Sequence, residues 1–186
     1  MIRVFISLLI IFMCAITVVA KQPYFSLDTA KNAASHNNKG LERLQDGYYD
    51  MAIAEFQLAI DLNPSSKACA VYYNNLGETY YKLGYYAQAQ QAYENALKIA
   101  PLNFLYYQNV VKSYKMEGLL QEKIQQYKAL EETNSLYKVL LGLCYIENGD
   151  TKRGIIKLDE FCMQEPYLII TNGVKRYLRE TLKLNY

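Results

Sequence analysis

The chain has 186 residues, enough for one domain, and its hydrophobic content of 52% supplies the apolar side chains that a core requires. Its 20 lysines and arginines are nearly balanced by 18 aspartates and glutamates. This balance excludes the strongly basic surface that nucleic-acid binding usually needs, so we expect no nucleic-acid partner.

The first 20 residues have the character of a secretory signal peptide. Arg3 precedes an uncharged run from Val4 to Ala20, and Val18 and Ala20 have the small-residue spacing of a cleavage site. We therefore expect export through the secretory pathway, to the periplasm or the medium in a bacterium. The run is also just long enough to cross a bilayer, so a membrane anchor of residues 4–20 remains the alternative, and we expect membrane contact only in that case. Residues 21–32 are expected to form a linker or a helix extension.

The cysteines are expected to be reduced and buried. Without residues 1–20 the chain keeps Cys69, Cys144 and Cys162, an odd number that cannot pair completely within one molecule. In an antiparallel helix pair, Cys144 and Cys162 would lie farther apart than the Cα separation of about 7 Å that a disulfide permits.

Glycines recur in pairs with one fixed separation along the chain. The pairs are Gly40 and Gly47, Gly77 and Gly84, and Gly142 and Gly149. At one fixed interval after the second glycine of each pair stand Pro64, Pro101 and Pro166. A degraded fourth copy lies between the last two pairs, with Tyr114, Gly118 and Tyr127 in place of Tyr80, Gly84 and Tyr93. A fixed period of this kind indicates a repeat architecture.

The pattern resembles the tetratricopeptide repeat, a helix-turn-helix unit that stacks on its neighbours. The signature positions of that family are occupied in the second unit by Tyr73, Leu76, Gly77, Tyr80, Ala89, Tyr93, Ala96 and Pro101. The resemblance implies an all-α fold, a right-handed superhelical solenoid of about four helix-turn-helix units plus a C-terminal capping helix. The units would be residues 33–66, 70–103, 104–134 and 135–168, the third of them degenerate, with residues 169–186 as the cap.

Glycine at the helix crossing has a physical role in this arrangement. Without a side chain at Gly77, the two helices of the second unit can approach closely. The third unit carries Val111 and Lys123 where the family prefers small residues, so we expect its two helices to depart most from the family's packing.

Most tyrosines fall on helical stripes that predict packing between helices. These are Tyr49, Tyr73, Tyr80, Tyr86, Tyr93, Tyr107, Tyr114, Tyr127 and Tyr145. Tyr81 lies off the stripe, on the side that lines a concave groove in this family, and is therefore expected to be available for binding.

Carried over position by position, the resemblance implies a peptide-binding groove made by the first helices of the units. Its residues would be Asn74, Glu78, Tyr81, Lys82, Gln108, Lys112, Lys115, Leu143 and Ile146. The equivalent positions of the first and fourth units also include Leu41, Leu44 and Val139, which are either buried by neighbouring segments or form an apolar binding patch. Asn37 and Leu41 replace the lysine and asparagine of a two-carboxylate clamp, which disfavours the acidic tails of cytosolic chaperones.

No constellation of residues predicts catalysis. The single histidine, His36, stands in SHNNKG without the cysteine or carboxylate spacing of a metal site. The glycine pairs belong to the repeat, and none precedes the Lys-Ser or Lys-Thr of a phosphate loop. We therefore expect no enzymatic activity, no metal and no cofactor.

The last segment predicts an amphipathic helix. One face carries Ile170, Val174, Tyr177, Leu178 and Thr181, whereas Lys175, Arg176, Arg179 and Lys183 lie elsewhere. Such a helix either covers the last apolar face of the solenoid or presents a basic surface to anionic lipid or an acidic partner.

These expectations combine into an exported, non-catalytic module that holds a segment of another protein in its concave groove. The alternative is a structural subunit of an envelope assembly that uses its convex face or its ends.

Overall fold

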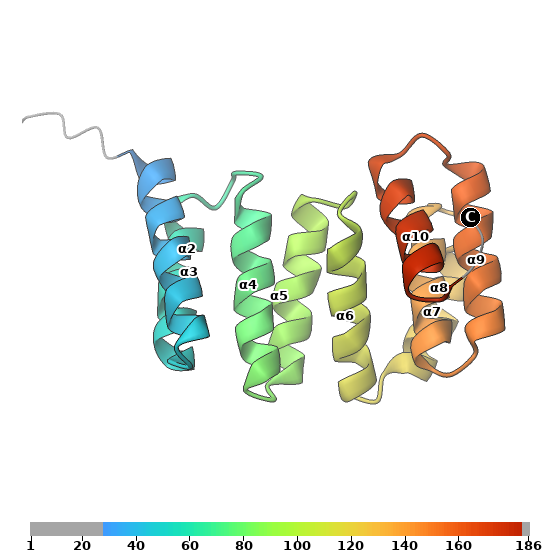
Figure 1. Cartoon of the computed structure of the whole chain (residues 1–186), viewed down its shortest axis with the longest axis horizontal. Coiled ribbons are helices and arrows are strands. Elements are labelled where there is room, and N and C mark those ends of the chain that lie inside the picture. Colours follow the sequence, from blue (N-terminus) through green and yellow to red (C-terminus); the bar gives the residue numbers. More distant parts are fainter. Residues whose placement is uncertain (1–27, 184–186) are drawn as a thin grey trace, which may run out of the picture.

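The computed structural model describes residues 28–183 and is helical throughout that part of the chain (Figure 1). Its helices are α2 (Thr29–Gln45), α3 (Tyr49–Leu62), α4 (Cys69–Lys82), α5 (Tyr86–Ile99), α6 (Phe104–Met116), α7 (Leu120–Leu130), α8 (Leu136–Glu147), α9 (Thr151–Gln164) and α10 (Ile169–Glu180). They follow one another as four helix pairs and a final helix, which confirms the predicted solenoid with its C-terminal helix.

The expected signal peptide of residues 1–20 and the alternative anchor of residues 4–20 lie outside the described residues. Between residues 28 and 183, no helix combines the length and the apolar character needed to cross a bilayer.

The turn within each pair is the same in all four units. Its glycine, Gly47, Gly84, Gly118 or Gly149, has a positive φ between 73° and 90°. At Gly84 the φ of 79° lies in the left-handed region, which a residue with a Cβ adopts only under strain. The next residue, Tyr85, donates its backbone N–H to the Tyr80 carbonyl at 2.9 Å and closes the helix end. The degenerate third unit therefore keeps the turn of the others.

A second glycine brings the two helices of a pair together. A Cβ added to Gly77 would lie 2.7 Å from the ring of Tyr93, which is closer than real Cβ contacts. Gly40 meets Phe56 in the same way, and Gly142 meets Leu158. The predicted close approach at Gly77 is thus confirmed, and each crossing is filled by one large side chain of the second helix.

The third pair lacks this contact because Val111 replaces the glycine. Its side chain is buried, and α6 approaches α7 much less closely than the helices of the other pairs approach each other, while α7 packs against α8. Lys123 lies over the ring of Tyr114 at 5.0 Å, where the other units have a small residue. The Tyr114 hydroxyl lies 2.8 Å from that of Tyr127 and donates to Glu94 at 3.0 Å. These contacts of Tyr114 replace part of the close helix contact that the third pair lacks.

The tyrosines mainly build the core. Five of the predicted packing tyrosines are buried, namely Tyr93, Tyr107, Tyr114, Tyr127 and Tyr145, and Tyr49, Tyr73, Tyr80 and Tyr86 are partly buried. Tyr72 and Tyr106 are also buried, although the helical stripes do not single them out. The packing role predicted for most tyrosines is therefore confirmed.

Cys69, Cys144 and Cys162 are free and buried, as expected. Burial raises the pKa of Cys144 to about 12 and that of Cys162 to about 11. Both thiols therefore stay protonated at neutral pH, in the form that is unreactive.

Helix α10 does more than cover the end of the stack. It buries Ile170, Val174 and Leu178 and contacts both α9 and α6, so it lies between them in Figure 1. Gly173 lies against Phe104, the first residue of α6, and the rings of Phe104 and Tyr177 are 5.5 Å apart. The C-terminal helix thus reaches back across the fourth unit to the third.

The close approach at Gly77 predicts a loss of stability on enlargement. Gly77→Leu must displace the buried ring of Tyr93, and overpacking of this kind costs about 1–3 kcal/mol. Removing a glycine from a helix offsets at most about 1 kcal/mol of this. The measurement is urea unfolding of the full chain. Gln91→Leu, at an exposed position of α5, should change the free energy of unfolding by no more than about 0.5 kcal/mol. Equal stability of the two variants would refute the packing role of Gly77.

Candidate peptide-binding groove

The first helices of the second and third units enclose a hollow of about 270 Å³. Its walls are formed by Asn74, Glu78, Tyr81, Tyr93, Leu105, Asn109 and Lys112. Four of the predicted groove residues, Asn74, Glu78, Tyr81 and Lys112, therefore meet around one space. Lys82 does not line it. The Lys82 ammonium instead lies 3.9 Å from the Glu78 carboxylate on the exposed side of α4.

Tyr81 is only partly available for binding. Its ring packs edge-on against Tyr86 with the centroids 5.2 Å apart, and part of it covers the core. The remaining surface faces the hollow, where Leu105, which is 49% exposed, lines the space from α6. The two side chains give an otherwise polar site an apolar wall.

Amide side chains connect the first helices in a regular way. The Asn75 side chain donates to Asn37 at 2.8 Å, and the Asn109 side chain donates to Asn74 at 2.8 Å. In both cases the donor is an asparagine of one unit and the acceptor is an asparagine of the preceding unit. Within its own unit, the acceptor stands one position earlier than the donor does. We call these two pairs the amide ladder. It joins α2 to α4 and α4 to α6.

The ladder leaves hydrogen-bonding groups free at the hollow. Among residues 28–183, nothing accepts from the Asn74 side-chain amino group, and nothing donates to the Asn109 amide oxygen. A donor and an acceptor side by side match the C=O and N–H of an extended peptide. The site can therefore hold a main chain as well as side chains.

The two charged side chains that line the hollow stand on different helices. Glu78 stands on α4, whereas Lys112 stands on α6, is exposed and forms no ion pair with any residue between 28 and 183. Tyr93 closes the floor, and burial raises the pKa of its hydroxyl, which stays neutral. Lys112 is thus ready to pair with a carboxylate, whereas Glu78 already lies near the Lys82 ammonium.

A second hollow of about 190 Å³ lies on the other side of Lys112. Its walls are Gln108, Val111, Lys112, Leu143, Glu147, Tyr177 and Thr181. Tyr177 and Thr181 belong to α10 and its C-terminal end, so the last helix closes this part of the groove. The exposed Lys115 donates to Glu147 at 2.9 Å, and this bond raises the pKa of Lys115. Lys115 is therefore already paired.

The apolar groove positions of the fourth unit are not open. Leu143 is 3% exposed and Val139 is fully buried, in the same cluster as Val174 and Leu178 of α10. Ile146 is partly buried and packs against Gly154 of α9. Leu143 nevertheless lines the second hollow, whereas Ile146 lines neither hollow and packs on α9. Leu41 and Leu44 are likewise partly buried against the core of the first two units.

Seven residues of the two hollows were not predicted as groove residues, namely Tyr93, Leu105, Asn109, Val111, Glu147, Tyr177 and Thr181. Asn109 had a signal in the sequence, since it follows Gln108 as Asn75 follows Asn74. Tyr177 had none, because its place depends on the path of α10.

The single histidine contacts a glutamate of the same unit. His36 Nδ1 lies 2.6 Å from the Glu55 carboxylate, and both side chains are about one-quarter exposed. Residues 28–183 contain no group of three or more histidine, cysteine or acidic side chains arranged to hold a metal ion.

The sequence profile of the tetratricopeptide repeat matches residues 33–66 and residues 70–103. The match identifies the first and second units as tetratricopeptide repeats. A comparison with curated proteins gives no match.

Solved tetratricopeptide-repeat structures are similar to this chain at low identity. The second such domain of human RPAP3, in complex with an HSP70 peptide, is 16% identical, with a TM-score of 0.49 over 72% of this chain and 97% of that one. The Arabidopsis OM64 domain is 17% identical, with a TM-score of 0.45 over 82% and 98%. A thermophilic tetratricopeptide-repeat protein of Thermus thermophilus is 20% identical, with a TM-score of 0.45 over 78% and 81%.

The amide ladder predicts coupled losses of stability. Asn37 and Asn75 are 8% and 9% exposed, so replacing either one by alanine leaves a buried polar group without its partner, at a cost of about 1–3 kcal/mol. The double variant should lose less than the sum of the two single variants, because it leaves no orphaned amide. Urea unfolding of all three variants measures the difference. Asn38→Ala, at an exposed position of α2, is the control. Strictly additive losses would show that the bond contributes nothing.

Proposed function

We propose that this protein is a non-catalytic interaction module of the tetratricopeptide-repeat family that binds an extended segment of another protein. The observation that carries the proposal is the hollow between α4 and α6, where the unpaired groups of Asn74 and Asn109 lie beside Lys112 and Glu78. This set offers hydrogen bonds to a main chain and one charge of each sign to side chains. Such chemistry suits recognition of a peptide.

The bound segment follows the open part of the groove. From the first hollow it passes Lys112 toward Gln108, because Lys112 lines both spaces. There α10 limits the path with Tyr177 and Thr181. The segment that the groove holds is therefore short and lies mainly over the second and third units.

A second function has its own supporting observation. Large apolar side chains are exposed near the C-terminal end of the stack, where Met163 is 69%, Tyr167 97% and Ile169 74% exposed. Exposed apolar groups of this kind mark contact surfaces when they form a patch. A structural subunit of an envelope assembly would use these residues instead of the groove.

Charge reversal in the groove tests the first function. Lys112→Glu removes the free cation of the hollow and places two carboxylates across from each other, so binding of the natural partner should weaken about tenfold. Lys98→Glu, at a position of α5 that lines neither hollow, is the matched control.

The experiment measures both how tightly the partner binds and which residues of the chain it contacts. A photo-crosslinking residue at Tyr81 or Lys112 of the full chain, expressed in its native host, should capture one partner, and the Lys112→Glu variant should retain less of it. Capture from Met163 or Tyr167 with no capture from the groove would support the structural subunit and reject the groove.

We further propose that the protein acts outside the cytoplasm, on the basis of residues 1–20 of the sequence. Export with cleavage after Ala20 predicts a mature N-terminus at Lys21. Mass spectrometry of the chain from the cell envelope and the medium measures that end. A chain of full mass in the membrane fraction would indicate the anchor, and a chain of full mass in the cytoplasm would reject export.

A further inference from the structure

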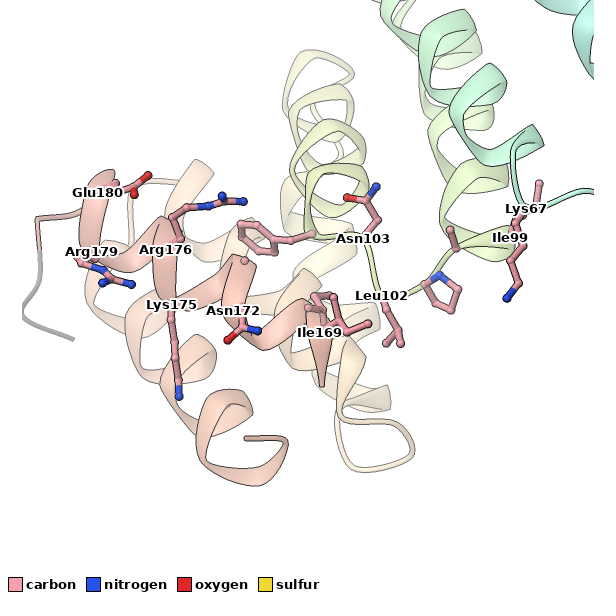
Figure 2. Close-up of a pocket in the computed structure, with 15 residues that line it drawn as sticks. Lys67, Ile99, Leu102, Asn103, Ile169, Asn172, Lys175, Arg176, Arg179 and Glu180 are labelled. Carbon is pink, nitrogen blue, oxygen red and sulfur yellow. The ribbon is translucent and has the colours of Figure 1, made fainter. Parts of the chain in front are cut away.

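A wide cleft opens outside the groove, at the edge of the solenoid where the units are joined. It measures about 1040 Å³ and is lined by three segments (Figure 2). Lys67 comes from the connection before α4, Ile99 to Phe104 from the connection of α5 with α6, and the rest from α10. None of the residues that line the two hollows of the groove lines this cleft. It is a separate site.

Positive charge is concentrated around the cleft. Lys67, Lys175, Arg176 and Arg179 line it, against the single carboxylate of Glu180. None of these four cations forms an ion pair with any residue between 28 and 183. The chain as a whole has a formal net charge of only +2, so this excess is local. Unpaired cations on facing walls raise the local concentration of anions.

Apolar side chains lie between the charges. Ile169 is 74% exposed and Leu102 is 37% exposed, and Figure 2 shows Leu102 on the segment between the walls with Ile169 beside it. Contact of such apolar side chains with water is unfavourable. A ligand that carries an apolar side chain would remove this surface from water.

We propose that this cleft binds an acidic peptide segment of a partner protein. Its carboxylates pair with Arg176, Arg179 and Lys67, and an apolar side chain packs on Leu102 and Ile169. Arginine suits this role because its planar guanidinium binds a carboxylate through two parallel hydrogen bonds.

The shape of the site favours a peptide over other anions. The cations line a hollow that is entered between two walls, whereas a flat bilayer surface would require them on one protruding face. The volume is at the upper end of the range of about 300–1,000 Å³ for ligand sites, far more than a single inorganic anion occupies. A phosphate ion also has no apolar group that could contact Leu102 and Ile169.

Direct binding to the full chain tests the proposal. The probe is a short fluorescein-labelled peptide of glutamates interrupted by leucines, followed by fluorescence anisotropy. Arg176→Gln with Arg179→Gln should weaken binding roughly tenfold or more, because two charge-assisted contacts are lost. Arg43→Gln with Lys128→Gln removes the same charge from exposed positions of α2 and α7 and should leave binding unchanged. Circular dichroism verifies that both double variants are folded.

The apolar part has its own pair of variants. Leu102→Ser should weaken binding of the same peptide, whereas Leu58→Ser, at a position of α3 that is 46% exposed, should not. A peptide with glutamine in place of every glutamate should bind weakly to the wild type. Arg176→Gln with Arg179→Gln should cause the same loss in a chain that also carries Lys112→Glu, so the result for the cleft does not depend on the groove.

Four results would overturn the proposal. The first is equal affinity of the wild type and the Arg176→Gln, Arg179→Gln variant, and the second is an equal loss in the control pair. The third is displacement of the peptide by inorganic phosphate alone, which would identify a simple anion site. The fourth is binding to phosphatidylglycerol vesicles that depends on Arg176 and Arg179 when the peptide does not bind, which would identify a membrane surface.

Discussion

The close contact between a glycine and one large side chain of the facing helix governs the geometry of this solenoid. Where Gly40, Gly77 and Gly142 meet Phe56, Tyr93 and Leu158, the two helices of a unit pack as one body. Where Val111 takes the place of the glycine, the pair opens and α7 packs against α8 instead. The stack is therefore regular through its first two units and rearranged after α6. The second hollow of the groove lies at this change, since Val111 lines it together with Tyr177 and Thr181.

The inner face changes character at the same place. The amide ladder passes from α2 through α4 to α6 and ends there, because α8 carries Val139 and Leu140 at the corresponding positions. A polar row can remain in water, but an apolar row needs a cover, and α10 supplies it with Val174 and Leu178. With α10 in this position, its apolar side is buried. Its cations, Arg176 and Arg179, are left facing the cleft at the solenoid's edge. One helix thus shortens the groove and builds the second site.

Patterns that repeat with the units could be predicted from the sequence. Spacing predicts the helix pairs, the role of Gly77 and the burial of Tyr93 and Tyr114, because the two helices of each unit pack on each other in a similar way. Tyr81, Asn74 and Lys112 were assigned to the groove by register, and they do line one hollow. Register also places Leu143 toward the groove, where it lines the second hollow, but carries no information about its burial in the cluster that includes α10. The path of α10 depends on a contact between Gly173 and Phe104, and periodicity cannot predict a contact between segments that are distant in sequence.

That contact also bears on how the chain reaches its folded state. In a solenoid each unit touches only its neighbours, so folding can start locally and spread, and the loops that must close are short. The contact of Gly173 with Phe104 breaks this rule because it joins α10 to a helix more than one unit away. Its formation closes a long loop and carries the corresponding entropic cost. The first two units can therefore form from local contacts alone. The third and fourth units, by contrast, complete their packing only when α10 has joined α6 and α9.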